Sequence, residues 1–409
     1  MIAYIDPTPI PGVSAPALQI AQTFGALAGA LSGVRLVTPA CASGEGSLSH
    51  LPGHSAIRAP GGRRRWFWPF ASRRPFLWAA CLWVARSQPR LLYLRNLRTA
   101  DYLSRRFPAI PFVFEAHEVF WRSRAFWHAN EGRGSGERLA RFKAMEQRVY
   151  DRAAGIVAIT AALAEDLRND FEYEGPLLVA PDGVDVRAAQ QVASVIEPTP
   201  GEVLYLGSGA AWKGIDTAIR AMAHVEGARL RVVGPTGEAA RSLLALAAHL
   251  GVSSRVCLEP FVSPARRFEF IARASVCLLP GSRAPIAERF TSPLKLFDYL
   301  ACGRPVIAGD VPAVREVLTH DITGWLTEVG NPRELAAGIS KLLGDEERRR
   351  RLGGAGARLA SRYDWSVRAA ALSRFLGERL RQASPEGRGS SGAKLPLIAP
   401  HGARVFANK

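Results

Sequence analysis

The chain has 409 residues, which is long for one domain and enough for two domains that each bury a core. Its 48% hydrophobic and 22% charged residues are typical of a globular protein, and its longest apolar stretches are too short to span a bilayer. The five cysteines are scattered without CxxC spacing, which argues against a disulfide framework or a zinc site. The first residues form a strand-like run unlike a signal peptide, so we expect reduced thiols, no bound metal and a cytoplasmic location.

The net charge of +17 is concentrated in one segment. Twelve arginines and a single acid lie between Arg58 and Arg106, and the Arg63–Trp78 region interleaves arginine with tryptophan and phenylalanine. Such a mixture suits docking on an anionic membrane surface, which would make the protein peripheral on the inner face of the cell membrane. A solvated basic surface with some of the rings in the core is an equal alternative. No nucleic-acid-binding module is visible, so no nucleic acid is expected as a partner.

Strand-like apolar runs alternate with helical patterns along most of the chain. Six such runs punctuate residues 1–181 and six more punctuate residues 203–328. Short apolar runs separated by amphipathic helices indicate parallel sheets in an α/β architecture. Two series of this kind predict two doubly wound domains.

The boundaries follow from changes in composition. A polar, proline-bearing stretch with no strong periodicity separates the two series, and the end of the chain is rich in glycine, serine and proline. We predict an N-terminal domain at 1–187, a linker at 188–201, a C-terminal domain at 202–364, a helix at 365–382 and a flexible tail at 383–409.

The stretch "RFTSPLKLFDYLACGRPVIAG" carries the strongest local signal. Ser292 followed by Pro293 is typical of a helix N-cap with proline at the first helical position. A helix that begins there points free N–H groups and its positive dipole end toward the preceding loop, which suits a phosphate. Asp298 interrupts the apolar pattern of this helix. The alternative is a cap that only stabilises a packing helix, with an exposed Asp298.

A second candidate phosphate site lies in "YLGSGAAWKGIDTAIRAM". A predicted strand ends at Gly207 and Ser208, and Lys213 opens a helix, although neither GxGxxG nor a P-loop is present. The chain holds 47 arginines and only six lysines, yet Lys213 and Lys295 fall in the two candidate phosphate sites. A compact ammonium group differs from a guanidinium fork, which favours a specific need for lysine at both positions.

Two further candidates follow predicted strands of the first series. His117 comes directly after "PFVFEA", at the carboxyl end of a strand, where open α/β sheets form their ligand crevice. A structural histidine is the alternative. Gly12 lies in the loop after the first strand, where a ligand can approach the backbone closely.

Taken in order, these motifs resemble those of the family 4 (GT4) retaining glycosyltransferases of the GT-B fold. The resemblance rests on "SPLKLFDYLACGRPVIAGDVPAVREVL", "EAHEVF", "VYDRAAGIVAITAALAEDL", "VAPDGVD", "WKGIDTAIRAM" and "TGWLTEVGNPRELAAGISKLL". It covers roughly residues 1–380 and is strongest over 200–365. It implies two Rossmann-like domains facing across a cleft, with the nucleotide-sugar donor on the C-terminal domain and the acceptor on the N-terminal one.

The resemblance also implies roles for single residues. Asp298 matches a carboxylate that receives the ribose hydroxyls, and Lys213 matches the lysine that neutralises the donor diphosphate. His117 matches a catalytic histidine that faces the transferred sugar. The remaining implied donor-binding residues are Gly12, Gly207, Ser208, Glu288, Phe290, Thr291, Ser292 and Leu294, while Asp182, Gly183 and Asp185 match a structural hinge.

Three departures from the family pattern stand out. The family has two glutamates in this signature, whereas the second is Asp298 here and the first is replaced by Phe290. Glu288 is the acid nearest to that first position. Ser208 replaces a basic residue that commonly precedes Lys213.

We therefore expect a metal-independent, retaining hexosyltransferase without a cofactor. It would move a sugar from a UDP- or GDP-sugar to a glycan or lipid-linked acceptor in envelope or exopolysaccharide synthesis. Two alternatives remain: a non-catalytic, nucleotide-sugar-binding relative of the same fold, and a membrane-docking interaction protein that works through its basic segment.

Overall fold

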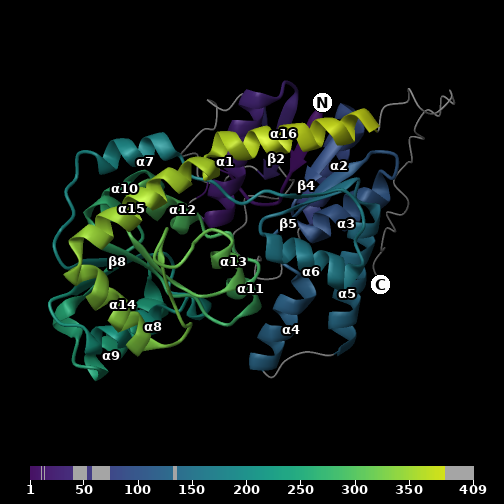
Figure 1. Cartoon of the computed structure of the whole chain (residues 1–409). Coiled ribbons are helices and arrows are strands. Elements are labelled where there is room, and N and C mark those ends of the chain that lie inside the picture. The colour runs from purple at the N-terminus through teal and green to yellow at the C-terminus, as the bar shows by residue number, and fades with distance from the viewer. Residues whose placement is uncertain (11, 13, 40–52, 58–73, 132–135, 383–409) are drawn as a thin grey trace, which may run out of the picture.

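The computed structural model describes residues 1–382 except residues 11, 13, 40–52, 58–73 and 132–135. Most of the basic, aromatic Arg63–Trp78 region and the whole predicted tail at 383–409 lie outside the described residues. The rest forms two α/β domains that lie side by side (Figure 1). In the part of the chain that is described, no helix is long and apolar enough to cross a membrane.

The N-terminal domain contains a seven-stranded parallel sheet in the order β3-β2-β1-β4-β5-β6-β7. Its strands are β1 (Ile2–Ile5), β2 (Val34–Pro39), β3 (His54–Ile57), β4 (Leu91–Leu94), β5 (Phe112–Ala116), β6 (Gly155–Ala158) and β7 (Leu177–Val179). Its helices are α1 (Ala15–Ala30), α2 (Arg74–Ser87), α3 (Leu97–Arg106), α4 (Phe120–Glu131), α5 (Gly136–Arg152) and α6 (Ala161–Phe171).

The two faces of this sheet bury different helices because side chains alternate along each strand. Leu92, Leu94 and Phe114 belong to a core shared with α2, α3, α5 and α6. Tyr4 and Tyr93 point to the other face, which α1 covers together with the last described helix, α16 (Trp365–Gln382).

The C-terminal domain contains a six-stranded parallel sheet in the order β10-β9-β8-β11-β12-β13. Its strands are β8 (Glu202–Leu206), β9 (Arg229–Val233), β10 (Val256–Glu259), β11 (Val276–Leu279), β12 (Val306–Gly309) and β13 (Trp325–Thr327). Its α-helices are α8 (Ile215–Ala221), α9 (Gly237–His249), α10 (Arg267–Arg273), α11 (Pro285–Glu288), α12 (Leu294–Ala301), α13 (Pro312–Arg315), α14 (Pro332–Gly344) and α15 (Glu346–Ala360). Short 3-10 helices are η3 (Ala211–Lys213), η4 (Met222–His224), η5 (Ser253–Arg255), η6 (Pro264–Arg266) and η7 (Ser361–Tyr363).

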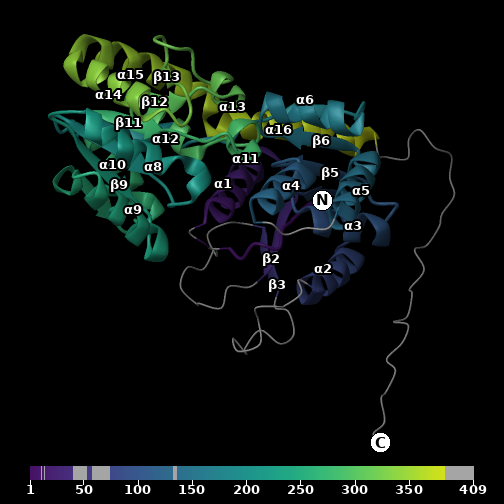
Figure 2. The same ribbon diagram turned by 90° about the horizontal axis from the view of Figure 1, so that it is seen from below.

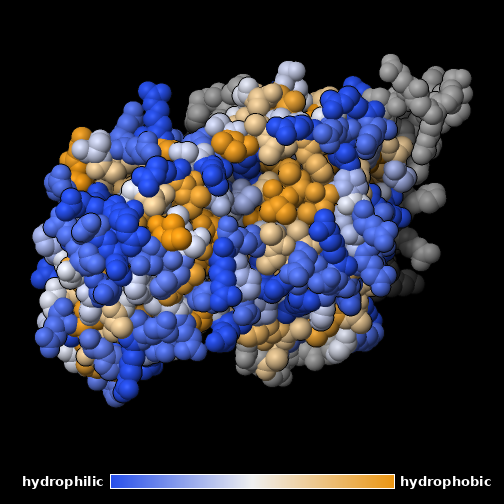
Figure 3. Space-filling view, viewed as in Figure 1, coloured by the Kyte–Doolittle hydropathy of each residue, from blue (hydrophilic) through white to orange (hydrophobic). Residues whose placement is uncertain are grey.

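The chain crosses between the domains twice, and the two crossings lie side by side. Val184 donates its N–H to the carbonyl of Tyr363 at 2.9 Å, and Trp365 donates to the carbonyl of Val184 at 3.3 Å. After the second crossing, α16 runs back over the N-terminal domain and packs on α1 (Figures 1 and 2). Polar residues cover much of the face in Figure 3, and apolar residues gather below α16.

The prediction of two parallel-sheet, Rossmann-like domains is confirmed. The sequence did not predict β3, whose four residues include His54 and Ser55. Helix α7 (Val186–Ala193) lies across the predicted start of the linker at 188–201, in a stretch where the sequence shows no strong periodicity. The Asp185 side chain caps α7 by accepting the N–H of Ala188 at 2.9 Å, and this local bond supports a helix that is too short to show clear periodicity.

Candidate functional site

Each sheet has one topological switch point, and the candidate residues follow the strands that flank it. In the C-terminal sheet β8 and β11 are neighbours from which the strand order runs in opposite directions, and in the N-terminal sheet β1 and β4 play the same part. Ligands of open α/β sheets bind beyond the carboxyl ends of such strands. The loops after β8 and β11 are therefore the candidate donor site.

Two lysines meet beyond the end of β8. Lys213 Nζ donates to the Ser208 hydroxyl at 2.8 Å, and Lys295 Nζ lies 4.1 Å from the ring centre of Tyr205. Burial lowers the pKa of Lys213. Burial also holds the pKa of Lys295 well below its usual range, and the charge of Lys213 lowers it further.

Neither amine has a carboxylate partner among the residues that the structure describes. Gly207 provides the space for this arrangement, because its φ is +147° and a Cβ atom there would lie 3.1 Å from Lys295 Nζ. Two desolvated cations that repel each other are stabilised by an anion that binds between them. The scarcity of lysine in the sequence pointed to both residues, although only Lys213 was assigned to the site.

The prediction that Ser292 caps the following helix was wrong. Helix α12 begins at Leu294, Pro293 occupies the cap position with an extended backbone, and no side chain caps the helix. Ser292 is therefore one residue too early, and its hydroxyl instead accepts the N–H of Asp182 in the other domain at 2.8 Å. The N–H of Leu296 donates to the carbonyl of Pro293 at 2.8 Å, and among the described residues no acceptor is recorded for the N–H groups of Leu294 and Lys295, which suits an anion.

Asp298 lies in α12 and is buried, with a relative exposure of 5%. Its Oδ2 accepts a hydrogen bond from Arg267 Nε at 2.9 Å. Burial raises the pKa of Asp298, while the Arg267 guanidinium opposes that rise. Among the residues that the structure describes, no hydrogen-bond partner is recorded for Oδ1, so one carboxylate oxygen is left to accept a hydroxyl group. Sequence reasoning missed Arg267, which is 31 positions away in the chain and carries no motif.

Phe290, predicted to bind the donor, is buried in an apolar core. It is 1% exposed and belongs to the core cluster of the N-terminal domain. The loop before α12 thus crosses the domain boundary, because an apolar ring gains more from that core than from a polar cleft.

The residues around Phe290 also hold the two domains together. Arg289 forms ion pairs with Glu165 at 2.8 Å and Asp166 at 2.7 Å in α6, and its carbonyl accepts the hydroxyl of Thr160 at 2.7 Å. Glu316 accepts the N–H groups of Ala161 and Ala162 at the start of α6, both at 2.7 Å.

The other residues of this loop take local roles. The hydroxyl of Thr291 donates to the carbonyl of Ile286, and Leu294 forms the first position of α12. Glu288 ends α11 and is half-buried. No hydrogen bond or ion pair of the Glu288 carboxylate is recorded within the described parts of the chain.

His117 lies just beyond β5 and is held by a buried carboxylate. Its Nε2 lies 2.7 Å from Glu115 Oε1, while Arg368 Nη2 donates to Glu115 Oε2 at 2.9 Å. Burial lowers the pKa of His117 to about 4, helped by the charge of Arg95 and opposed by Glu115. The imidazole is therefore neutral at pH 7. Sequence reasoning found His117 but missed Glu115 and Arg368.

Gly12 and the hinge residues take separate positions. Gly12 is exposed in the loop before α1. Asp182 is buried and accepts a hydrogen bond from Gln19, and burial raises its pKa to about 6. A Cβ atom on Gly183 would lie 2.9 Å from the ring of Trp365, so this crossing needs glycine.

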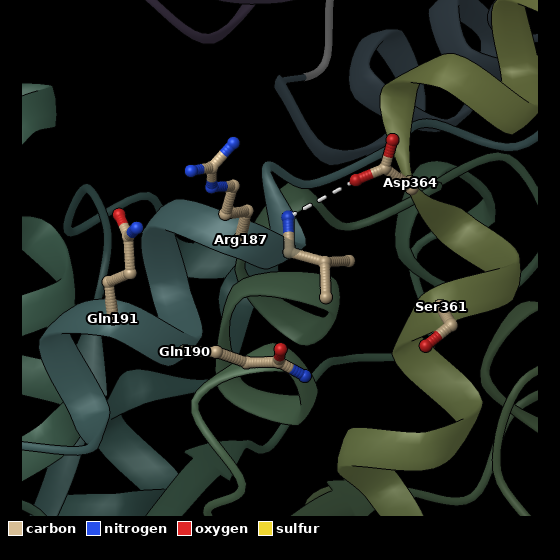
Figure 4. A pocket seen from close by; sticks show the side chains of 6 residues that line it. Arg187, Gln190, Gln191, Ser361 and Asp364 are labelled. Carbon is tan, nitrogen blue, oxygen red and sulfur yellow. Dashed lines mark hydrogen bonds between the residues drawn. The ribbon is translucent and has the colours of Figure 1, made fainter.

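One surface pocket lies away from these residues. It has a volume of about 360 Å³ and lies where α7 and η7 meet at the crossings (Figure 4). Its lining contains none of the predicted site residues: Val186, Arg187, Gln190, Gln191, Ser361 and Asp364. Among the described residues, no three His, Cys, Asp or Glu side chains cluster closely enough to hold a metal ion.

Curated relatives match a little more than half of the chain. A D-inositol 3-phosphate glycosyltransferase from Xylanimonas cellulosilytica is 33% identical over 248 residues, which are 56% of this chain and 57% of that protein. Its counterpart from Thermobispora bispora is 30% identical over 259 residues, which are 58% of this chain and 59% of that protein. The chain thus spans a little more than half the length of the relatives it matches.

Solved structures share the fold over nearly the whole chain. Sucrose-phosphate synthase from Thermosynechococcus elongatus has a TM-score of 0.77 at 20% identity, covering 94% of this chain and 99% of that one. Anabaena Alr3699/HepE, solved in complex with UDP, has a TM-score of 0.69 at 16% identity, covering 92% of this chain and 99% of that one.

Family models match both halves of the chain. "Glycosyltransferase Family 4" matches residues 25–188, and "Glycosyl transferases group 1" matches residues 186–359. Together with the two parallel sheets and the order of the motifs, these matches identify the chain as a member of the family 4 glycosyltransferases of the GT-B fold.

Proposed function

We propose that this glycosyltransferase takes its sugar from a nucleotide-diphosphate sugar, UDP- or GDP-linked, and transfers it with retention of anomeric configuration. The observation that carries the donor assignment is the pair of amines of Lys213 and Lys295. Both are desolvated, both lack a carboxylate among the described residues, and they lie beyond the carboxyl end of β8 at the switch point.

A diphosphate group would complement the two positive charges of Lys213 and Lys295. As the glycosidic bond breaks, negative charge grows on the leaving diphosphate, and fixed cations in a site poor in water stabilise it. The first N–H groups of α12 add partial positive charge from the other side. These cations supply the role that a metal ion plays elsewhere, which supports a metal-independent reaction.

The carboxylate of Asp298 and the imidazole of His117 complete the proposed roles. Asp298 has one oxygen bonded to Arg267 and one left to accept from the ribose diol. His117 faces the transferred sugar, and its neutral ring accepts a hydroxyl hydrogen bond there. The leaving diphosphate takes the acceptor proton, since no pairing of a nucleophile with a base is evident among the described residues.

The acceptor is a glycan or a lipid-linked saccharide in this proposal, and a phosphorylated acceptor has separate support. The curated relatives are named for D-inositol 3-phosphate. In the N-terminal domain, the guanidinium carbons of Arg98 and Arg124 lie 5.7 Å and 4.2 Å from the ring centre of Phe142. No ion pair or hydrogen bond of the Arg98 guanidinium is recorded within the described residues, whereas the charges of Glu118 and Glu146 act on Arg124, so Arg98 is the better candidate to meet an anion. The membrane-surface location and the envelope role rest on the Arg63–Trp78 region alone.

A binding screen tests the donor assignment. Calorimetric titration with UDP-, GDP- and ADP-sugars is expected to show one tight donor, with affinity at least tenfold weaker in Lys295→Met and Asp298→Ala. Lys341→Met serves as the control, because Lys341 is exposed in α14 and far from the switch point in sequence. Equal binding to all four proteins, or no binding to the unaltered protein, rules out the donor site.

Turnover separates the enzyme from a binding protein. With the selected donor, D-inositol 3-phosphate and crude lipid-linked acceptors are offered in turn, and product is followed by mass spectrometry with and without EDTA. Transfer that persists in EDTA and gives an α product from an α donor supports the full proposal. Tight donor binding with only slow donor hydrolysis supports the non-catalytic alternative.

A further inference from the structure

A single buried carboxylate joins His117 to α16, the last helix that the structure describes. Glu115 is fully buried in β5, and its Oε1 lies within hydrogen-bond distance of His117 Nε2, at 2.7 Å. Its Oε2 accepts from the hydroxyl of Tyr93 and from Arg368 Nη2, the latter at 2.9 Å. Three donors from three different segments thus converge on one carboxylate.

Arg368 reaches this carboxylate from the first turns of α16. The residue is 5% exposed, and its Nη1 donates to the carbonyl of Ala180 and, at 3.0 Å, to the carbonyl of Pro181. One guanidinium therefore fixes α16, the chain after β7 and Glu115 relative to one another. Such a planar fork with several acceptors holds its geometry better than an ammonium group.

The charges in this cluster balance without His117. Burial raises the pKa of Glu115, but the charge of Arg368 and the hydrogen bond from His117 outweigh it and hold that pKa well below the usual range. The ionised Glu115 thus already has a buried counter-ion in Arg368. Without Arg368, Glu115 would lose its hydrogen-bonded counter-ion and keep only the weaker influence of Arg95, and protonation of His117 would offset that loss.

We propose that Arg368 is a positioning residue that acts through Glu115, keeping His117 a neutral imidazole with its proton on Nε2 and Nδ1 as an acceptor. A neutral ring with Nδ1 unprotonated can accept a hydrogen bond from a sugar hydroxyl, whereas an imidazolium can only donate. The inference relies on the proposed function only for the statement that Nδ1 meets the sugar.

Other ionisable groups around His117 also influence its pKa. They come from the chain after β1, β4 and β7 as well as from the strands themselves. The ionisable side chains that act on His117 or on its partner Glu115 are Tyr4, Tyr93, Arg95, Asp182 and Arg368, and Asp6 acts on Tyr4 and Arg95.

Nitrogen NMR of the protein labelled with ¹⁵N-histidine tests the proposal without any nucleotide. The His117 signals are assigned by their loss in His117→Gln. In the unaltered protein, His117 is expected to stay neutral with its proton on Nε2 from pH 8 down to pH 5, about one unit above its pKa of about 4. A ring that titrates near its ordinary pKa, or that carries its proton on Nδ1, overturns the proposal even if no variant folds.

Variants of Arg368 supply the decisive comparison. Arg368→Gln removes the charge but keeps one donor, and the pKa of His117 is expected to rise, so that the imidazolium forms at a higher pH than in the unaltered protein. Arg368→Lys keeps the charge and is expected to restore the neutral ring. Arg379→Gln is the matched control, because Arg379 is also buried in α16 but pairs with Glu378 and Phe375.

A purely structural role of Arg368 predicts a different result. Loss of helix docking would lower the melting temperature of Arg368→Gln and Arg379→Gln alike and leave His117 neutral in both. That outcome, or an imidazolium in Arg368→Lys, contradicts the proposal. Failure of the unaltered protein to bind any nucleotide sugar would contradict the proposed function and leave the NMR result standing.

Discussion

Lys295 illustrates at the scale of one residue how a binding site costs stability. Its amine is held beside Lys213 over the ring of Tyr205, with no carboxylate among the described residues to offset the repulsion. We expect such a group to be retained for binding an anion, and not for stabilising the fold.

Replacing Lys295 by methionine is therefore expected to separate stability from binding. Folding lowers the pKa of Lys295, so the unfolded state binds the proton more tightly at neutral pH and the charged lysine opposes folding. Lys295→Met is expected to raise the melting temperature by about 2–4 °C while weakening donor binding about tenfold or more. Thermal unfolding and calorimetry check both, and a lowered melting temperature in Lys295→Met but not in Lys341→Met would contradict the argument.

His117 predicts a specific pH dependence of stability. Its pKa is about 4 in the folded protein and near 6.5 when unfolded, so the unfolded state binds more protons between these values. Stability that is fully present above pH 6.5 is thus lost as the pH falls toward 4, by up to about 3 kcal/mol from this group. Urea unfolding at pH 7.5 and 4.5 should show a smaller difference for His117→Gln than for the unaltered protein. His224→Gln, at an exposed position, should behave like the unaltered protein.

The same residues show what the sequence can predict of the site. Lysine scarcity and the strand end at Ala116 indicated Lys213, Lys295 and His117, because these signals are local. Their partners could not be predicted in this way. Glu115 meets Arg368 across 253 positions, and Ser292 meets Asp182 across 110, so only the folded chain brings these pairs together.

Elements were predicted where local pattern and tertiary packing agree. Buried strands such as β8 and β12 read as apolar runs because both faces of a parallel sheet are covered. Strand β3 was not predicted because it is short and partly polar. Helix α7 was not predicted because its eight residues are too few to show a clear helical period. The start of α12 was misjudged because Ser292 has the right chemistry for a cap but binds another domain.

Helix α16 is the element on which the N-terminal domain most depends. Leu372, Phe375 and Leu376 fill a core cluster with Ile20 and Phe24 of α1. Ending the chain after Asp364 is expected to expose that cluster, so the protein should bind a hydrophobic dye and lose cooperative unfolding. Ending it after Gln382 keeps every residue of the cluster, and equal behaviour of the two truncated proteins would show that α16 is dispensable.

At the scale of the whole molecule, hydrogen bonds and ion pairs of defined geometry join the two domains. Glu316 accepts two N–H groups at the start of α6, which places a carboxylate from one domain at a helix N-terminus of the other. Hinge motions are the usual result when an interface of this kind is loosened.

Glu316→Ala is expected to loosen the two domains without unfolding either. The loss of a capping carboxylate is expected to cost about 1 kcal/mol and to widen the distribution of domain orientations. Small-angle scattering should show a larger radius of gyration, and donor affinity should fall. Glu334→Ala, an acid in the first turn of α14 within one domain, is the control. An unchanged scattering profile for Glu316→Ala would contradict the role of this contact.

The return of α16 to the first domain also sets an order of events during synthesis. The core clusters of the C-terminal domain use only residues from Val184 to Ala360, so that domain is complete before the ribosome reaches α16. The N-terminal domain emerges first but lacks one wall until the last helix leaves the exit tunnel. We therefore expect the half translated second to fold first, with the nascent N-terminal half depending on chaperones in the meantime.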